Sequence, residues 1–303
     1  MSQGLIFDIK PYAINDGPGI RIAIYYKGCP LACEWCHNPE SISPHVQKMF
    51  TQSKCIGCGE CVKACPKNAC RLDKNEGIIT DPDLCKLCGK CAEVCPTGAT
   101  EMSGYMASVE DIMSRIKKET VFFDHSKGGV TFSGGEPLQQ PKYLIELLDE
   151  CGKEGIHRAV DTSGFAKTEI LLEVAKRTDL FLYDFKMLDP IKHKKYTGVS
   201  NEKILENLKI LAESGARINF RYPMIKGVNA ELDEIRGMAE FIAGLAGEKK
   251  EISILPFHNL AEMKHKKLGN DYELSGMTEP SVEEQSRAIE IFEEYGLKAS
   301  IGG

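Results

Sequence analysis

The stretch IAIYYKGCPLACEWCH, residues 22–37, joins an apolar run to a loop that holds three cysteines. The run IAIYY has the composition of a buried β-strand, which Lys27 and Gly28 then end. Cys29, Cys33 and Cys36 follow in the spacing C-x3-C-x2-C. Because a tetrahedral metal site takes four ligands, three cysteines leave one position open. The stretch therefore predicts a strand that carries an incomplete metal site at its carboxyl end.

Candidate strands and helices alternate along the rest of the chain. Strands separated by helices predict an α/β fold with a parallel sheet. The number of units favours a partial (β/α)6 TIM-like barrel, with a doubly wound open sheet as the alternative. The strands are expected at 129–133, 158–162, 180–185, 218–223, 251–256 and 297–301, and the helices at 107–118, 140–153, 167–176, 201–214, 230–246 and 281–295.

Polar motifs follow most of these candidate strands. In a parallel sheet of this kind, binding and catalytic groups gather at the carboxyl ends of the strands. We therefore expect the motifs to meet the three-cysteine loop at one rim. They are SGGEP at 133–137, DTSG at 161–164, Asp184 with Lys186, Arg221, and His258.

Two further cysteine runs lie between residues 48 and 104. CIGCGECVKACP at 55–66 and CKLCGKCAEVCP at 85–96 both read C-x2-C-x2-C-x3-C-P. This spacing resembles two-cluster bacterial ferredoxins, in which the fourth cysteine of each run ligates the other run's cluster. The resemblance implies a ferredoxin-like insert at 48–104 within a barrel built from 1–47 and 105–303. One 4Fe–4S cluster would bind Cys55, Cys58, Cys61 and Cys95, and a second would bind Cys65, Cys85, Cys88 and Cys91.

Zinc is a poorer match to this doubled pattern, because structural zinc sites use two C-x2-C pairs. Two of the thirteen cysteines, Cys70 and Cys151, have no partner spacing, and we expect both only to pack. The eleven others are the expected metal ligands.

Composition narrows the function classes. A formal charge of −6 and a pI near 5.8 disfavour a general nucleic-acid binder. The amino terminus lacks a basic stretch followed by an apolar core, and no run of 18 apolar residues occurs. We therefore expect a cytoplasmic protein with no membrane partner. The lysine-rich stretches at 192–195 and 263–267 could dock an acidic flavodoxin, although a solvated face is the simpler interpretation.

The three-cysteine loop, with Trp35 before its last cysteine, resembles the radical S-adenosylmethionine (SAM) enzymes. The resemblance implies a third 4Fe–4S cluster on Cys29, Cys33 and Cys36, whose open iron binds SAM. Trp35 and the rim motifs would then bind the cofactor. Ser133, Gly134, Gly135 and Glu136 resemble the element that receives the methionine amino group; Asp161, Thr162, Asp184 and Lys186 resemble the segment at the ribose and carboxylate side; Arg221 and His258 would approach the methionine carboxylate and the sulfonium or adenosyl region.

NDGPGIR at 15–21 and CHNPE at 36–40 resemble one branch of that superfamily, the glycyl radical enzyme activating enzymes. The resemblance implies that the loop of Asp16 meets a peptide of a partner glycyl radical enzyme, and it adds Asp16, Lys186 and His258 to the cysteines as expected catalytic residues. Some relatives bind a monovalent cation near Asp161 and Asp184, where Leu182 here offers only its backbone carbonyl. Such a cation remains an open alternative.

The two-cluster insert resembles the subgroup that activates glycyl radical dehydratases, decarboxylases and lyases, other than the activator of pyruvate formate-lyase. The implied reaction is reductive cleavage of SAM to a 5'-deoxyadenosyl radical, which takes a hydrogen atom from a glycine of the partner. Reduced flavodoxin or ferredoxin would supply the electron. Two alternatives are a radical SAM enzyme that acts on a small molecule and a polyferredoxin electron carrier; the second leaves the polar motifs outside the insert without a purpose.

Overall fold

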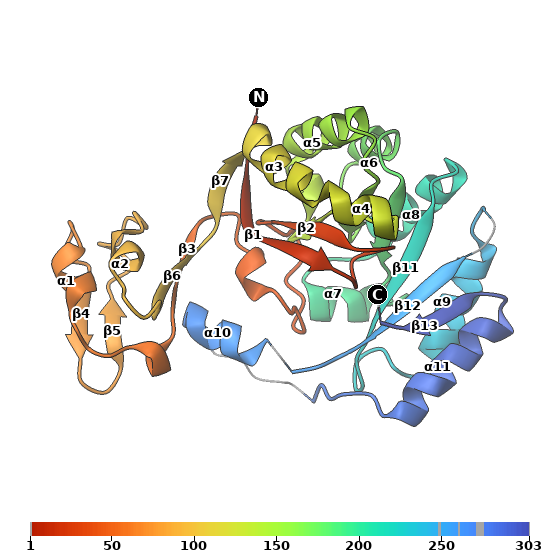
Figure 1. The fold of residues 1–303 in the computed structure, drawn as a ribbon. Coiled ribbons are helices and arrows are strands. Elements are labelled where there is room, and N and C mark those ends of the chain that lie inside the picture. The colour runs from red at the N-terminus through yellow and green to blue at the C-terminus, as the bar shows by residue number, and fades with distance from the viewer. Residues whose placement is uncertain (1, 248–249, 260, 271–275, 303) are drawn as a thin grey trace.

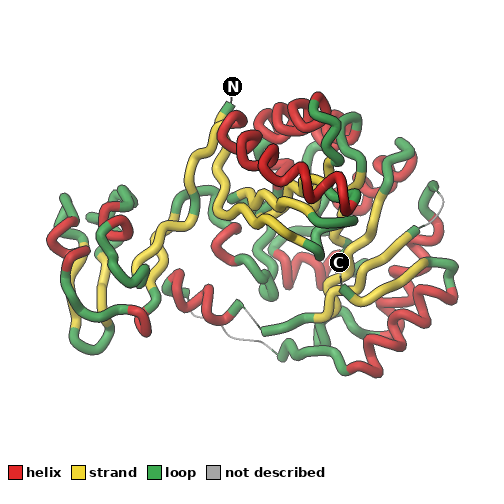
Figure 2. The backbone as a smooth tube through the Cα atoms, viewed as in Figure 1, coloured by secondary structure: helices red, strands yellow, loops and turns green. Residues whose placement is uncertain are grey.

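A sheet of nine strands forms the centre of the protein (Figures 1 and 2). The computed structural model describes residues 2–247, 250–259, 261–270 and 276–302. The strand order is β13-β12-β11-β10-β9-β8-β2-β1-β7. The strands are β1 (Gln3–Ala13), β2 (Arg21–Tyr26), β7 (Tyr105–Ser108), β8 (Gly129–Gly134), β9 (Arg158–Thr162), β10 (Leu180–Asp184), β11 (Ile218–Met224), β12 (Glu251–Pro256) and β13 (Lys298–Ile301).

The strands from β2 through β8 to β13 are parallel and stand side by side in chain order. A doubly wound sheet reverses its strand order at a switch point. No reversal occurs in this parallel part, so the doubly wound alternative is wrong for the described chain. The expected strands all form, within a residue or two of the predicted bounds. β1, which pairs antiparallel with both β2 and β7, was not expected.

Helices cover the outer face of the sheet (Figure 1). Six of them lie within the expected ranges: α3 (Val109–Ile116), α5 (Pro141–Lys153), α6 (Thr168–Ala175), α8 (Glu202–Glu213), α9 (Leu232–Gly244) and α11 (Val282–Glu294). Their apolar faces pack on the sheet in one large core, which includes Leu144, Leu147, Leu148 and the fully buried Cys151. Cys151 thus behaves as a packed hydrophobe. The short helices α4 (Thr120–Ser126), α7 (Pro190–Thr197) and α10 (Glu262–Leu268) were not expected.

The cysteine-rich segment stands to one side of the central sheet, at the left of Figure 1. It leaves and returns through two antiparallel strands, β3 (Gln47–Phe50) and β6 (Thr100–Ser103), which we call the neck. Beyond the neck lie the hairpin of β4 (Cys70–Asp73) and β5 (Gly77–Thr80) and the short helices α1 (Glu60–Ala64) and α2 (Lys90–Glu93). None of these strands joins the nine-stranded sheet.

Helix α10 holds the neck beside the body of the protein. Lys267 on this helix forms an ion pair with Glu101 of β6 at 3.7 Å. Lys264, one turn earlier, forms an ion pair with Glu40 of the cysteine loop at 2.7 Å. One helix thus contacts both cysteine-bearing regions. Among the described residues, no helix is long and apolar enough to span a membrane.

Candidate functional site

The three-cysteine loop begins where β2 ends, and its backbone is fixed on both sides. Gly28, with φ of 102°, donates its N–H to the carbonyl of Ser41 at 2.7 Å. Further along, the N–H of Ala32 donates to the carbonyl of Thr197 at the end of α7, at 2.8 Å. Burial raises the pKa of the Cys33 thiol to about 12. Such a thiol becomes a thiolate only when a metal or another positive charge compensates it.

The glycines after β8 let two loop backbones touch. The N–H of Gly135 donates to the carbonyl of Tyr26 at 2.7 Å, and the N–H of Glu136 donates to the carbonyl of Gly28 at 2.9 Å. A Cβ atom on Gly135 would lie 2.4 Å from the Gly28 oxygen, so only glycine fits there. The SGGE segment is thereby held against the start of the cysteine loop.

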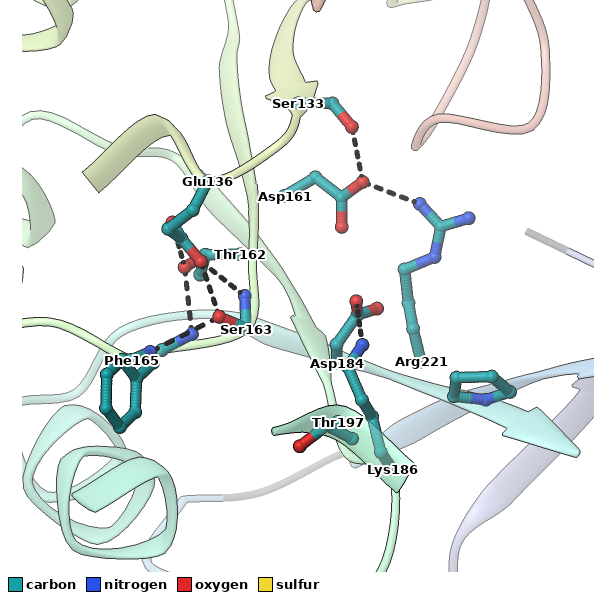
Figure 3. A network of polar contacts seen from close by, with 12 residues as sticks. Ser133, Glu136, Asp161, Thr162, Ser163, Phe165, Asp184, Lys186, Thr197 and Arg221 are labelled. Atoms are coloured by element: carbon teal, nitrogen blue, oxygen red, sulfur yellow. Dashed lines mark hydrogen bonds and ion pairs between the residues drawn. The ribbon is translucent and has the colours of Figure 1, made fainter. Parts of the chain in front are cut away.

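Glu136 joins the ends of β8 and β9 through a fully buried carboxylate (Figure 3). Its oxygens accept hydrogen bonds from the Thr162 hydroxyl at 2.8 Å and from the Ser163 hydroxyl at 2.6 Å. They also accept from the backbone N–H groups of Ser163 at 2.9 Å and Leu138 at 3.1 Å. Burial raises the Glu136 pKa, and these hydrogen bonds oppose that rise. The carboxylate therefore positions two rim loops and keeps its oxygens occupied.

A second polar cluster joins side chains from three strands, β8, β9 and β11 (Figure 3). The Ser133 hydroxyl donates to Asp161 Oδ2 at 2.6 Å, and Arg221 Nη1 donates to the same oxygen at 3.2 Å. Burial raises the pKa of Asp161 to about 6, while Arg221 opposes the rise. Asp161 Oδ1 and Arg221 Nε are buried without a protein partner. One of these unsatisfied atoms is an acceptor and the other is a donor. A bound zwitterion could form hydrogen bonds with both.

Asp184, the last residue of β10, and Lys186 just after it form a third polar element. Lys186 Nζ donates to Asp184 Oδ2 at 2.7 Å, and only 8% of the lysine side chain is exposed. Burial lowers the Lys186 pKa, but Asp184 and Cys33 outweigh it and leave the pKa above its ordinary value. A charged ammonium thus lies between the cysteine loop and a carboxylate.

The loop between β1 and β2 brings Asp16 to this cluster from the opposite edge. The buried Arg21 guanidinium holds the loop, donating to the Pro18 carbonyl at 3.0 Å and the Thr131 hydroxyl at 2.6 Å. Asp16 accepts a hydrogen bond from the Tyr25 hydroxyl at 3.2 Å and lies 3.9 Å from Arg221. Arg21 and Tyr25 were not among the expected site residues, although Arg21 closes the NDGPGIR motif that pointed to this loop.

A cavity of about 610 Å³ opens beside Arg221. The Asp16 loop lines one side of it through Asn15, Gly17 and Pro18, and Ser300 and Ile301 of edge strand β13 line another. In the described chain the two edge strands, β7 and β13, do not pair with each other, so the sheet remains open. The cavity therefore lies between the Asp16 loop and β13, over the beginnings of β10, β11 and β12.

Two expected cofactor residues lie apart from the charged cluster. His258, just after β12, has 54% of its side chain exposed and contacts Glu279 at 3.1 Å. Trp35 is buried in a small apolar cluster with Met187, Ile225 and Phe257. Trp35 offers an apolar surface beside the cysteine loop, whereas His258 stays at the solvent-exposed end of its strand.

The eight cysteines of the two runs line two separate cavities, and a ninth, Cys70, also lines the second. The first is lined by Cys55, Cys58, Cys61 and Cys95, and the second by Cys65, Cys85, Cys88 and Cys91, with volumes of about 20 and 170 Å³. In each, the fourth cysteine comes from the other run. Gly59 and Gly89 adopt φ of 74° and 80° immediately before α1 and α2, which turns each loop around its cavity.

In the described chain, no three His, Cys, Asp or Glu side chains are arranged to hold a single metal ion. Cysteines around a 4Fe–4S cluster bind four different irons, so their sulfurs stand farther apart than the ligands of one ion. In the insert, four cysteines line each cavity in the combination that two-cluster ferredoxins use for their ligands. The Asp161 and Asp184 carboxylates, where a monovalent cation was considered, already contact Arg221 and Lys186.

The lysine-rich stretches are not simple solvated faces. His193 is buried and hydrogen-bonds through Nδ1 to the Val199 carbonyl at 2.7 Å. Lys264 reaches Asn38 Oδ1 at 2.6 Å as well as Glu40. Lys194, Lys195 and Lys266 are exposed, as expected for a solvated face, whereas His193, Lys264 and Lys267 make contacts within the protein.

Comparison with known proteins places this site in a family. Residues 23–242 match the model of the Radical SAM superfamily. The chain is 41% identical to the trans-4-hydroxy-L-proline dehydratase activating enzyme of Clostridioides difficile, covering 99% of each protein. It is 36% identical to the choline trimethylamine-lyase activating enzyme of Oleidesulfovibrio alaskensis, covering 99% of this chain and 98% of that protein.

A solved structure agrees with these relatives. A domain of the pyruvate-formate lyase-activating enzyme from Bacteroides vulgatus is 42% identical, with a TM-score of 0.51, over 58% of this chain and 99% of that domain. The match to the family model covers most of the chain, and the two relatives match over nearly their whole lengths. The chain therefore belongs to the radical SAM superfamily and, within it, to the activating enzymes of glycyl radical enzymes.

Proposed function

We propose that this protein cleaves SAM at the three-cysteine loop and transfers the radical to a glycine of a partner glycyl radical enzyme. Cys29, Cys33 and Cys36 would hold the catalytic 4Fe–4S cluster through three irons. When bound, this cluster supplies the electron that splits SAM into methionine and a 5'-deoxyadenosyl radical. The observation that carries the proposal is the meeting of the loop with oppositely charged buried groups at one rim.

The charged cluster suits the methionine end of SAM. Its carboxylate would lie against Arg221, whose Nε lacks a partner, and its ammonium against Asp161, whose Oδ1 lacks one. Lys186 adds a second positive charge next to Cys33. A ligand that satisfies both unpartnered atoms removes the desolvation cost that each carries alone. Gly134 and Gly135 would let the ligand approach the β8 edge, and Trp35 would provide an apolar contact for the adenosyl group.

The expected roles of Glu136, Thr162 and His258 change in this proposal. Glu136 and Thr162 bond to each other, so they would orient the β8 and β9 loops around SAM without holding it. His258 would have to turn from Glu279 to reach the adenosyl group. We retain it as a residue at the rim of the site. A monovalent cation is not proposed, because Lys186 and Arg221 already neutralise both carboxylates.

The partner's glycine would enter through the cavity between the Asp16 loop and β13. That cavity reaches Arg221, and the loop's position is fixed by Arg21. An extended peptide suits an entrance lined by glycine, which lets another backbone approach closely. The partner would be a dehydratase, lyase or decarboxylase of the glycyl radical type, and trans-4-hydroxy-L-proline dehydratase is the first to test because that relative is the more similar of the two compared.

The partial barrel and the ferredoxin-like insert at 48–104 belong to the same proposal. The chain-order sheet with an open edge supports the barrel, and the two four-cysteine cavities support two further 4Fe–4S clusters. Three clusters in all would hold about twelve irons. A reduced flavodoxin or ferredoxin would deliver electrons to the insert.

The test is anaerobic. Iron and sulfide are measured in the reconstituted protein, and electron paramagnetic resonance (EPR) spectra of the reduced form are recorded before and after SAM is added. We expect about twelve irons, one signal altered by SAM, and a glycyl radical signal once the partner enzyme is present. About eight irons with no spectral change would reject the radical mechanism. Consumption of SAM without any protein partner would indicate a small-molecule substrate instead.

A further inference from the structure

The two four-cysteine cavities of the insert are lined by side chains of different charge. The second cavity, of Cys65, Cys85, Cys88 and Cys91, is also lined by four lysines and by no acidic residue in the described chain. The first cavity has no charged side chain among its described lining residues. The lysines are Lys48, Lys67, Lys86 and Lys90, whereas the first cavity is completed by Phe50, Ile56, Gly59, Ile78, Thr97, Ala99 and Thr100.

The difference in charge between the two cavities comes from equivalent positions of the two cysteine runs. When the two cysteine runs are aligned, Lys86 corresponds to Ile56, Lys90 to Glu60, and Lys67 to Thr97. The backbone around the two cavities is built alike, with a left-handed glycine and a short helix in each half. In the first half, Glu60 forms an ion pair with Lys63 at 2.7 Å, so its charge is partly balanced. The three lysines thus contribute a charge of +3 around the second cavity, whereas the three residues aligned with them have a total charge of −1.

Lys48 has no counterpart in that alignment, because it comes from neck strand β3. Its Nζ donates to the Thr80 hydroxyl at 2.6 Å and contacts Cys70 Sγ at 3.4 Å. These two contacts fix the ammonium at the wall of the second cavity. Cys70 is buried, lines the same cavity and contacts this lysine, so it helps to place the ammonium.

We propose that the site of Cys65, Cys85, Cys88 and Cys91 takes the first electron that enters the insert. This inference rests on the proposed function, since it requires that both sites hold clusters. In the step, a one-electron donor of the flavodoxin or ferredoxin class is oxidised by one electron, and the cluster gains that electron without a bond being made or broken. The added negative charge is stabilised by nearby ammonium groups, and net charge is one determinant of cluster potential.

Of the two cavities, the second lies at the end of the neck nearer to the barrel. Gln47 and Ser103 are register partners at the barrel end of the neck, and Gln47 accepts a hydrogen bond from Lys27 at 2.8 Å. The next pair outward, Lys48 and Met102, lines the second cavity. The outermost pair, Phe50 with Thr100, lines the first cavity. The electron would therefore settle at the site closer to the three-cysteine loop.

The test measures reduction potentials in full-length protein from which the SAM-site cluster has been removed by Cys33→Ala. Iron content comes first: fewer than about eight irons would show that the insert does not hold two clusters, which contradicts the proposed function itself. With both clusters present, an EPR-monitored potentiometric titration should show two separate one-electron steps. A single step at one potential would overturn the inference while leaving the proposed function intact.

The two steps are assigned with further variants in the same background. Cys58→Ala removes a ligand of the first site, and Cys88→Ala removes a ligand of the second. The cluster that remains in the Cys58→Ala variant should have the higher midpoint potential. A higher potential in the Cys88→Ala variant would reverse the proposed order and reject it.

A charge-exchange variant tests the cause without removing any ligand. It combines K67T, K86I and K90E with I56K, E60K and T97K, all drawn from aligned positions, so the composition is unchanged. We expect the two midpoint potentials to approach each other or invert, because only Lys48 then favours the second site. Lys153→Gln, on α5 outside the insert, is the control and should leave both potentials unchanged. Potentials that do not move on exchange would exclude the lysines as the cause.

Discussion

The three-cysteine loop and the insert both bring several cysteines together, but the surroundings of these cysteines differ. Cys29, Cys33 and Cys36 lie in a buried region next to charged residues from several distant strands. In the insert, Cys58 and Cys88 are exposed, and the four expected ligands at each cavity come from the two short cysteine runs. A site that must bind and cleave a charged small molecule needs groups that only a whole sheet can bring together. The expected ligands of the insert, by contrast, come from two short segments of the chain.

The sharpest way to separate the two regions is to remove one cysteine from the loop. Cys33→Ala should abolish formation of 5'-deoxyadenosine, since the third protein ligand of the catalytic cluster is lost. The insert should keep its clusters, so the iron content should fall from about twelve to about eight. Product is measured by chromatography and iron by colorimetric assay, with the core variant Cys151→Ala as control. Product formation at the wild-type rate would refute the assignment of the loop.

The second prediction concerns the buried ion pair of Asp161 and Arg221, near the three-cysteine loop, and its effect on stability. Arg221→Met leaves Asp161 buried without its cation, and breaking such a pair costs about 3 kcal/mol in free energy of unfolding. Urea denaturation followed by circular dichroism, in oxygen-free buffer, measures the loss. Adding Asp161→Asn to Arg221→Met should restore part of the stability, because the unpaired charge is then gone. If the double variant is as unstable as the sum of the single ones, the pair is not coupled.

Glu136 tests whether the rim loops depend on a buried carboxylate. In Glu136→Gln, an amide NH2 replaces an oxygen that accepts from the Ser163 N–H and hydroxyl, so a donor would face a donor. Losing that acceptor should lower the free energy of unfolding by about 2 kcal/mol. The exposed Glu150→Gln, on α5, is a matched control. Equal denaturation midpoints for the two variants would contradict the network that joins β8 to β9.

A smaller effect follows from the pKa of Asp161, which burial raises to about 6. Above that pH the carboxylate is ionised and can bind the SAM ammonium, and below it the charge is lost. SAM affinity should therefore fall by about tenfold from pH 7 to pH 5, one pKa unit being worth about 1.4 kcal/mol. Anaerobic equilibrium dialysis measures the affinity, and Asp161→Asn should flatten the profile. In the insert, by contrast, iron retention should not change over this range.

The parts of the fold that follow local rules could be predicted from the sequence. The parallel strands and their helices have clear periodicity, and the cysteine spacing predicts which cysteines share a cavity in the insert. β1 was missed because much of its length is exposed and it carries Lys10 and Pro11, which weaken the strand signal. α7 was missed because lysine obscures its apolar positions, although Asp189 caps it and Pro190 begins it.

The sequence predicted which residues belong to the candidate site better than it predicted what each residue does there. Strand ends pointed to Asp161, Asp184, Lys186 and Arg221, and the structure brings them to one rim. The pairing of Glu136 with Ser163 depends on the close contact of two loops, which no local pattern encodes. The contribution of Tyr25 was hidden for a similar reason, because an aromatic residue inside a strand is most often part of the core.

Because the insert is joined to the rest of the protein through the neck alone, it could be removed as one unit. Gln47 and Ser103 face each other in antiparallel register, so their Cα atoms are about 5 Å apart. A two-residue turn can close such a gap. A gene could thus gain or lose the whole cysteine-rich segment between these two points while the order of the nine-stranded sheet and the three-cysteine loop stayed as they are.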